Sequence, residues 1–158
     1  MLIYTPRLHS ETGRFCFYGD DKMKLTYTID NIMTKEIVTV DVDETVADAM
    51  QQMVAFEIGS VAITRQEEFV GILTERDVLK CFNSDLQSAG RKAGEDMSHP
   101  LVSIDATAAI GQAADLMAGE HIRRLLVTSG GTICGILTER DLMRATIDVF
   151  KKLSDAWV

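Results

Sequence analysis

The sequence predicts a mixed α/β (α+β) fold built from two copies of one β-α-β-β-α unit. The first observation is a seven-residue stretch, GILTERD, which occupies residues 71–77 and recurs unchanged at residues 135–141. The second is that the same shift of 64 positions pairs Met33 with Met97 without a gap. The third is that strand-like and helix-like hydrophobic patterns follow one another in the same order in both copies. A repeat of this length, present only twice, indicates one tandem pair rather than a solenoid.

The first copy predicts its elements in order. Residues 29–33 form a short helical or turn segment, and residues 36–40 alternate β-branched side chains as a strand does. Asp43, Glu44 and Thr45 supply cap and first-turn acids for a helix, whose apolar positions recur at the spacing of one helical face. The remaining elements are a strand at 60–64, a polar turn at 65–68, a strand at 69–73, and a helix from Thr74 to about residue 82.

The second copy predicts the same order. A strand at 101–104 precedes a helix lined by Ile110, Ala113, Ala114 and Met117. The pair Gly130-Gly131 is a strong hairpin signal between strands at 125–128 and 133–137. Thr138 begins a longer helix that runs to about residue 153. We therefore divide the chain into an N-terminal extension at 1–26, a first repeat at 27–87 and a second at 88–158. Each repeat has too few apolar residues for an independent core, so we expect the two to share one.

Composition and charge limit the possible partners. The 158 residues are 46% hydrophobic and 25% charged, as in an ordinary globular protein. A net charge of −8 without a Lys/Arg cluster disfavours nucleic acid as the main ligand. No stretch approaches the roughly 20 apolar residues of a membrane span, and the first residues lack a signal peptide's apolar run. The three scattered cysteines fit a reducing cytosol and lack metal-ligand spacing. We expect a cytoplasmic protein with no metal site.

The repeated stretch allows two interpretations. In one, Thr74 caps a helix and Asp77 completes a capping box, as Thr138 and Asp141 do in the second copy. In the other, the strand-to-helix junction binds a phosphate, with Arg76 contacting phosphate oxygens and the carboxylate accepting from ribose hydroxyls. The glycine that opens each stretch, Gly71 or Gly135, favours the second interpretation, because it permits close approach to the backbone. Capping alone does not explain seven unchanged residues when helix positions elsewhere differ between the copies.

Two β-α-β-β-α repeats that each contain Gly-h-h-Thr-x-x-Asp (h is apolar) resemble a tandem pair of cystathionine-β-synthase (CBS) domains, a stand-alone Bateman module. The resemblance covers about residues 27 to 153 and includes the segments that enter the repeats, 31–34 and 96–98. It implies a pseudo-twofold module with two clefts for adenosine-containing ligands such as AMP, ADP, ATP or S-adenosylmethionine. It also implies a homodimer, with the helical faces of Met50, Met53 and Met117 as the interface. Packing within the module is the simpler role for these methionines.

The resemblance also implies a set of ligand-binding residues. Asp77 and Asp141 would hold ribose hydroxyls, while the threonines and arginines beside them would lie near the phosphates. The full set is Thr39, Ile58, Gly59, Ser60, Thr74, Arg76 and Asp77 from the first repeat, and Ser103, His121, Arg123, Arg124, Thr138, Arg140 and Asp141 from the second.

The two clefts are not expected to be equal. At positions related by the 64-residue shift, Gly59 and Ser60 of the first copy correspond to Arg123 and Arg124 of the second. Two extra arginines favour a polyphosphate at the second cleft and leave the first weak or empty. The alternative interpretation of these arginines is that they are solvated surface residues. The alternative for His121 is that it lies at a helix end without contacting a ligand.

The function that follows is a regulatory adenosine-nucleotide sensor that transmits its ligand state to an unknown partner. Two alternatives are an S-adenosylmethionine-binding regulator and a purely structural dimerisation or adaptor module. We expect no enzyme and no catalytic residue or cofactor, because the chain contains no Ser/His/Asp or Cys/His set and no Walker-type loop.

Overall fold

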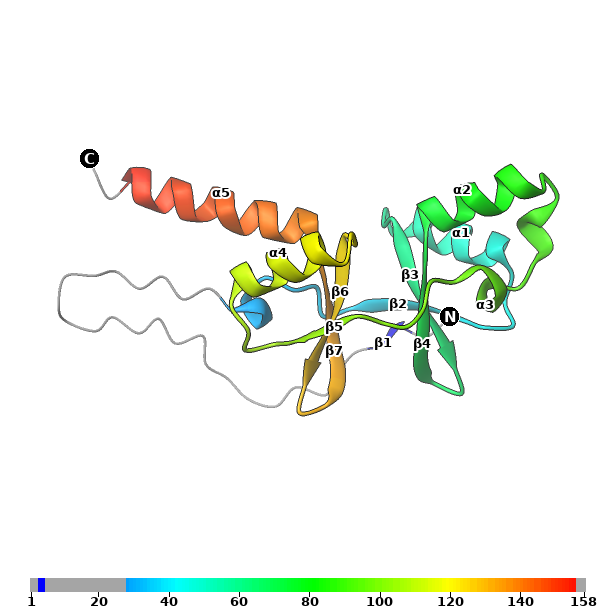
Figure 1. Cartoon of the computed structure of the whole chain (residues 1–158), viewed down its shortest axis with the longest axis horizontal. Coiled ribbons are helices and arrows are strands. Elements are labelled where there is room, and N and C mark those ends of the chain that lie inside the picture. Colours follow the sequence, from blue (N-terminus) through cyan, green and yellow to red (C-terminus); the bar gives the residue numbers. More distant parts are fainter. Residues whose placement is uncertain (1–2, 5–27, 156–158) are drawn as a thin grey trace. The chain divides into compact units, whose positions relative to one another are not determined.

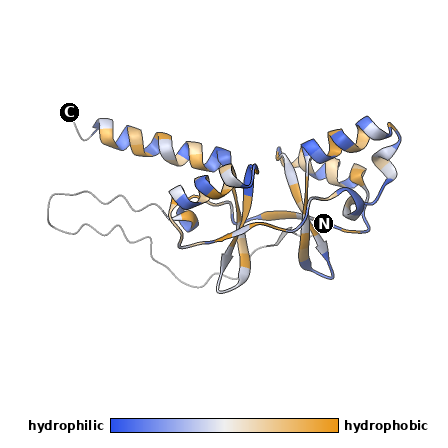
Figure 2. Cartoon of the chain, in the orientation of Figure 1, coloured by the Kyte–Doolittle hydropathy of each residue, from blue (hydrophilic) through white to orange (hydrophobic). Residues whose placement is uncertain are grey.

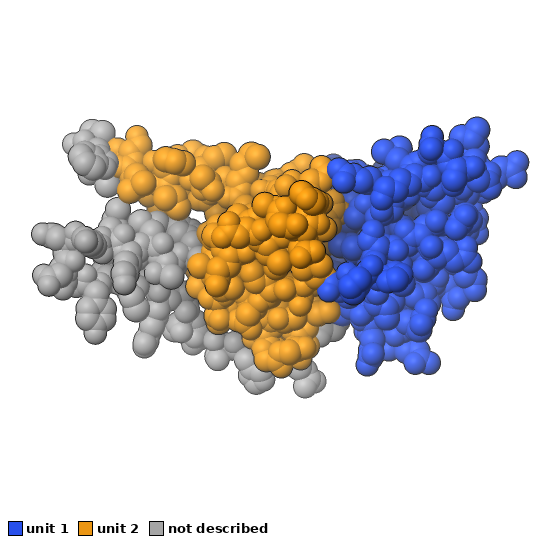
Figure 3. All heavy atoms as spheres, viewed as in Figure 1, with its two compact units in different colours: residues 1–5, 36–101 blue, residues 6–35, 102–158 orange. Residues whose placement is uncertain are grey.

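The computed structural model describes residues 3–4 and 28–155, which form two compact units (Figure 3). Unit 1 takes in the described residues 3–4 and 36–101, and unit 2 takes in 28–35 and 102–155. Each unit contains the β-α-β-β-α order that the repeats predict (Figure 1). Within the described residues, no helix is both long enough and apolar enough to cross a membrane.

Unit 1 contains a four-stranded sheet in the order β1-β2-β3-β4. The short β1 (Ile3–Tyr4) pairs antiparallel with β2 (Ile37–Asp41), β2 runs parallel to β3 (Ser60–Arg65), and β3 forms a hairpin with β4 (Glu68–Thr74). The helical elements are α1 (Val46–Ala55), α2 (Glu75–Ser84), the 3-10 turn η2 (Ser88–Gly90) and α3 (Ala93–Asp96).

The core of unit 1 follows from strand alternation and helix periodicity. Val61 and Ile63 of β3 are fully buried, and Val61 lies opposite the buried Leu73 of β4. The same cluster includes Val46 and Ala49, which lie on one face of α1. Burial of one face of the sheet under α1 and α2 therefore fixes the strand register, since a slip of one residue would turn this face to solvent.

Unit 2 repeats the arrangement with a three-stranded sheet in the order β5-β6-β7. The strands are β5 (Ser103–Asp105), β6 (Arg124–Ser129) and β7 (Thr132–Thr138), and the helical elements are η1 (Ile29–Asn31), α4 (Ile110–Gly119) and α5 (Glu139–Asp155). The hairpin predicted at Gly130-Gly131 is confirmed, with both glycines at positive φ. The corresponding turn of unit 1 places Gln66 and Glu67 at positive φ without any glycine.

The segment that enters each repeat packs in the unit formed mainly by the other repeat. Ile29 is fully buried in the core of unit 2, and Thr34 exchanges backbone hydrogen bonds of 2.8 and 2.9 Å with Ile136 of β7. Ala93 is likewise buried in unit 1, and Ser98 exchanges such bonds of 2.8 and 3.1 Å with Ile72 of β4. The buried residues thus form two clusters, each drawn from both repeats, rather than the single shared core expected from the sequence.

Two of the three methionines expected at a dimer interface are buried in the cores instead. Met53 and Met117 are buried in the cores of units 1 and 2, so neither presents its side chain to a partner. Met50 is exposed by 36% of its surface. The packing role is correct for Met53 and Met117, and the interface role is wrong for both. Met53 and Met117 lie on the faces of α1 and α4 that pack on the cores, and the exposed apolar side chains lie on other helix faces.

Candidate functional site

The repeated stretch spans a strand end and a helix start in both units. Gly71 to Thr74 complete β4, and the next residue begins α2; Gly135 to Thr138 and α5 repeat the arrangement. Each strand is the last in the order of its sheet and leads directly into the helix, so that the threonine lies at the helix N-terminus (Figure 1). The predicted strand-to-helix junction is therefore present twice.

Thr74 and Asp77 form the capping box predicted by the simpler interpretation. The Asp77 N–H donates to the Thr74 hydroxyl at 3.2 Å, while the Thr74 hydroxyl and N–H donate to Asp77 Oδ2 at 2.7 and 3.1 Å. Thr138 and Asp141 make the same three bonds at 3.4, 2.6 and 2.9 Å. One oxygen of each carboxylate therefore holds the helix start, and Oδ1 is the oxygen through which either residue can accept from a ligand.

The two Oδ1 atoms have different surroundings. Lys80 Nζ donates to Asp77 Oδ1 at 3.3 Å, and Asp77 is 8% exposed. Asp141 is half-buried, and no donor in the described part of the chain reaches its Oδ1. The second carboxylate is thus open to a ligand, whereas the first is engaged by a cation of its own helix.

The helix N-termini have less capacity for an anion than expected. The Glu75 N–H donates to the Gly59 carbonyl at 3.2 Å, and the Glu139 N–H donates to the Arg123 carbonyl at 3.1 Å. The third N–H of each helix is used in the capping box. Of the first three N–H groups, only that of Arg76 or Arg140 is left for a phosphate, so side chains must supply most of the binding.

Residues 58–60 and 122–124 lie beside these junctions. Ser60 is the register partner of Thr74, and Arg124 is the register partner of Thr138. The bonds to the Gly59 and Arg123 carbonyls tie the preceding residues to the first helical turn. Arg123 is exposed and Arg124 half-buried. The structure therefore brings two arginines to the strand-to-helix junction that holds Asp141, and a glycine and a serine to the one that holds Asp77.

Thr39 and Ser103 occupy the neighbouring strands. Thr39 pairs with Ala62, and Ser103 pairs with Leu126. Each partner lies two positions along its strand from Ser60 or Arg124, so the side chains share one face of the sheet. Thr39 is 9% exposed, whereas Ser103 is exposed. The half-buried Ile58 precedes β3, and Arg76 and Arg140 are exposed on the first helical turns.

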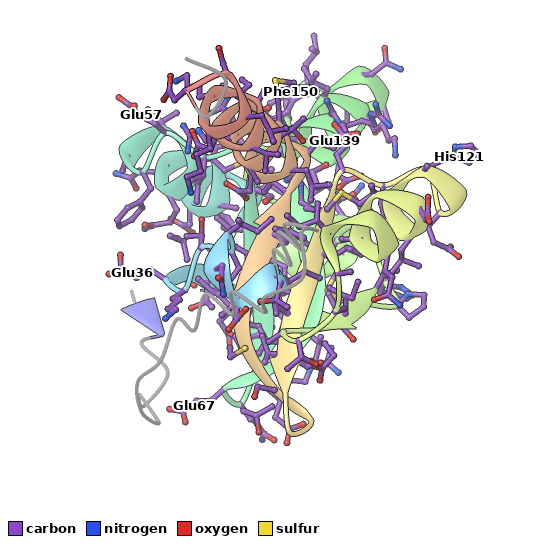
Figure 4. All side chains as sticks on the ribbon, turned by 90° about the vertical axis from the view of Figure 1, so that its left-hand side faces the viewer. Glu36, Glu57, Glu67, His121, Glu139 and Phe150 are labelled. Carbon is purple, nitrogen blue, oxygen red and sulfur yellow. The ribbon has the colours of Figure 1, made fainter. Side chains whose placement is uncertain are left out.

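His121 takes the helix-end position that the sequence left open. It follows α4 at φ 54°, and Ile122 N–H donates back to the Met117 carbonyl at 3.0 Å, as in a Schellman motif. Glu57 has φ 53° at the same position after α1. Both side chains are exposed, and both are labelled in Figure 4.

Two features were not recognised from the sequence. The first is Lys80, whose spacing of three residues from Asp77 on one helix is a detectable signal. The second is a pocket of about 410 Å³ in unit 1, lined by Asp77, Lys80, Cys81, Ser84, Glu95, Asp96, Met97 and Ser98. Nothing in the sequence indicates that α3, which enters the second repeat, lines a hollow beside the first GILTERD stretch.

Neither described cysteine has the surroundings of a nucleophile. Burial, followed by the nearby charge of Asp105, raises the pKa of the Cys134 thiol. This agrees with its prediction as a small apolar strand residue. Cys81 is buried in the core of unit 1. Within the described ranges, no group of three or more His, Cys, Asp or Glu side chains is arranged to hold a metal ion.

Comparison with known sequences identifies both repeats. The family model for the CBS domain matches residues 29–84 and 93–148. An uncharacterized 17.7 kDa protein of Acidianus ambivalens is 33% identical over 124 residues, which are 77% of this chain and 74% of that one. An uncharacterized protein of Methanopyrus kandleri is 29% identical over 120 residues, covering 74% and 61% of the two chains. The CBS domain-containing protein YhcV of Bacillus subtilis is 28% identical over 115 residues, covering 73% and 82%.

Solved structures show the same fold. A CBS-domain containing protein from Agrobacterium tumefaciens superposes with a TM-score of 0.72 at 24% identity, covering 75% of this chain and 92% of that one. CBSX2 in complex with AMP gives 0.68 at 24% identity, covering 78% and 98%. A CBS domain pair in complex with 5′-methylthioadenosine and S-adenosyl-L-methionine gives 0.69 at 19% identity, covering 77% and 96%. At these identities the similarity establishes the architecture of the pair.

Proposed function

The chain belongs to the CBS domain family, whose paired domains are regulatory modules, and we propose that it senses AMP, ADP or ATP and transmits its ligand state to a partner protein. The observation that carries the proposal is the open Oδ1 of Asp141, next to Thr138 and Arg124. A half-buried carboxylate oxygen suits a ribose hydroxyl, and an arginine beside it suits a phosphate. No catalytic role is proposed for any residue.

The second half-site is the stronger one in this proposal. Arg123, Arg124 and Arg140 would contact the phosphates, Asp141 would hold the ribose, and Thr138 would lie between them. Ser103 would contact the base or ribose there, as Thr39 would in the first half-site, which Ile58 would line. In the first half-site, Thr74, Arg76 and Asp77 have only Gly59 and Ser60 beside them, so less positive charge is available for phosphate. His121, at a helix end, would contact only the far end of a polyphosphate.

Two other functions predict different ligands. The solved CBS pairs in complex with AMP and with S-adenosyl-L-methionine support an adenosine ligand for this chain. They do not indicate which charged group is attached to the adenosine. S-adenosylmethionine carries no phosphate, and the arginines beside Asp141 therefore favour a nucleotide over it. A purely structural module would bind neither.

Calorimetric titration with AMP, ATP and S-adenosylmethionine tests the proposal. Replacing Asp141 with Asn keeps an oxygen for the capping box but removes the charge that attracts the ribose, so nucleotide affinity falls at least tenfold while the fold is retained. Asp48→Asn is the matched control, because Asp48 forms the same capping box with Thr45, at 2.6, 2.9 and 3.1 Å, outside the repeated stretch. Absence of binding by all three ligands at millimolar concentration would contradict the sensor and favour an adaptor.

We also propose that the protein acts in the cytoplasm as a homodimer. The supporting observation is an apolar stripe on α5, formed by Met143, Ile147 and Phe150, which are exposed by 63%, 46% and 65%. Their spacing of four and three residues places them on one face of the helix, whose apolar positions Figure 2 shows between hydrophilic ones. This stripe replaces the interface expected around Met53 and Met117.

A further inference from the structure

We infer that Lys80 is an affinity-determining residue of the first half-site, where its ammonium group competes with ribose hydroxyls for Asp77. The inference rests on the proposed adenosine-binding function and adds a reason for unequal half-sites that is separate from Arg123 and Arg124. It assigns to Lys80 a role in binding that Arg144, its counterpart in the second unit, does not share.

The first step is the use of the Asp77 carboxylate. Its Oδ2 accepts from both the hydroxyl and the N–H of Thr74, so it is committed to the capping box. The other oxygen accepts from Lys80 Nζ at 3.3 Å. Both oxygens therefore have a protein donor, and a ribose hydroxyl that approaches Oδ1 competes there with the ammonium group.

The second step is the comparison with the other unit. The 64-residue shift relates Lys80 to Arg144, which lies one turn after Asp141 on α5. No ion pair joins Arg144 to Asp141 in the described part of the chain. Because the capping boxes are alike, the ion pair at Asp77 is a difference between the half-sites that the identical GILTERD stretches do not contain.

The third step is access. Asp77 and Lys80 both line the pocket of about 410 Å³ in unit 1, together with Met97 and Ser98. The other charged side chains of this pocket, Glu95 and Asp96, are engaged by Arg91 at 3.7 and 2.9 Å. A ligand that reaches Asp77 from this pocket thus also lies beside the Lys80 side chain. Lys80 is 70% exposed, so its release into solvent is inexpensive and its competition is modest.

Titration of the full chain with adenosine and with AMP tests the inference. In the Asp141→Asn background, which leaves the first half-site to be measured, Lys80→Met keeps the length and helix preference of the side chain and removes its charge. We expect both ligands to bind about two- to fivefold more tightly, the range of an exposed ion pair. Arg144→Met is the matched control and leaves the affinity unchanged. Thermal unfolding of each variant verifies the fold.

Each other outcome decides against the inference. If Lys80→Met leaves adenosine and AMP affinity unchanged, the ammonium group does not compete. If it weakens AMP alone, Lys80 is a phosphate ligand instead. If the parent binds nucleotide but the Asp141→Asn background binds none, with or without Lys80, the inference fails while the sensor stands. If no adenosine ligand binds the parent or any variant, the inference and the proposed function fail together.

Discussion

Met97 packs directly on the backbone of Gly71, and this contact joins the entry of the second repeat to the GILTERD stretch of the first. A Cβ at Gly71 would lie 2.8 Å from Met97 Cγ and 3.2 Å from its Cβ. Met33 makes the equivalent contact with Gly135, where a Cβ would lie 2.6 Å from the Met33 sulfur and 2.9 Å from the Thr34 carbonyl oxygen. Both glycines are thus required by packing, and the close approach predicted at this position is made by the protein itself.

Replacing Gly135 with Ala should destabilise the protein by about 1–3 kcal/mol, the usual cost of overpacking a core. The backbone oxygen of Thr34 cannot move away as easily as a side chain, because it accepts a hydrogen bond from the Ile136 N–H. Gly111→Ala in α4 is the control: nothing lies within 4 Å of its Cβ position, so better helix propensity stabilises by about 0.5–1 kcal/mol. Urea unfolding measures both, and equal effects would contradict the packing role.

At Gly71 the clash is with a side chain, so a second substitution can relieve it. Gly71→Ala alone should lower the free energy of unfolding by about 1–3 kcal/mol. Combined with Met97→Ala, the loss should be smaller than the sum of the two single effects, because the atoms that collide are gone. A double-mutant cycle from urea unfolding measures this coupling, and additive losses would show that the two residues do not interact.

Most of the fold was predictable because its determinants are local or repeated. The β-α-β-β-α order, the hairpin at Gly130 and the helix starts at Thr74 and Thr138 follow from hydrophobic period, turn residues and caps. The exchange of entry segments was not predictable, because the sequence around Ile29 indicates only a short helical or turn segment and the sequence around Ala93 only a link between the repeats. Neither pattern indicates which core the residue joins. Only the three-dimensional packing assigns each to the other repeat's unit.

The residues of the candidate site were predictable, but which of their atoms are open to a ligand was not. The repeat identified the Thr and Asp positions, and the register places Ser60 and Arg124 beside them. Which carboxylate oxygen remains open depends on side-chain geometry, since Lys80 and Arg144 are both cations one turn after an aspartate. One makes an ion pair, and the other makes none within the described residues.

His121 and Glu57 adopt a left-handed conformation that costs a residue with a Cβ about 1 kcal/mol. Substituting either with Gly should therefore stabilise the protein by about that amount, raising its melting temperature by a few degrees. Glu120→Gly is the control, because Glu120 ends α4 at φ −87° and gains nothing from the change. His121→Gly should also leave AMP affinity within twofold. A larger loss would show that the imidazole contacts the ligand.

Acid should destabilise the protein through the capping box that Thr45 and Asp48 form. Hydrogen bonds from the hydroxyl and then the N–H of Thr45 hold the pKa of Asp48 below its ordinary value of 3.8. A carboxylate with a lower pKa in the folded chain stabilises it above the unfolded value, and this contribution is lost as the pH falls through the folded pKa. Urea midpoints measured between pH 6 and pH 2.5 should fall less steeply for Asp48→Asn than for the parent.

The control for the acid experiment is Asp115→Asn, since Asp115 is an exposed carboxylate on α4. This variant should follow the parent curve. If the Asp48→Asn and Asp115→Asn curves coincide, the Thr45 hydrogen bonds contribute nothing to the pH dependence, and other carboxylates account for the acid sensitivity.

The apolar stripe of α5 should hold the homodimer together. Phe150→Asp places a charge where a partner helix would bury an aromatic ring, so the dimer should dissociate at micromolar concentration while the helix content stays the same. Light scattering after gel filtration gives the mass, and circular dichroism verifies the helix. Leu86→Asp is the matched control, because Leu86 is 85% exposed in unit 1 and lies outside the stripe. If the dimer survives Phe150→Asp but is lost with Leu86→Asp, the interface lies on unit 1 and not on the α5 stripe. If the parent protein is monomeric, the proposed homodimer is wrong.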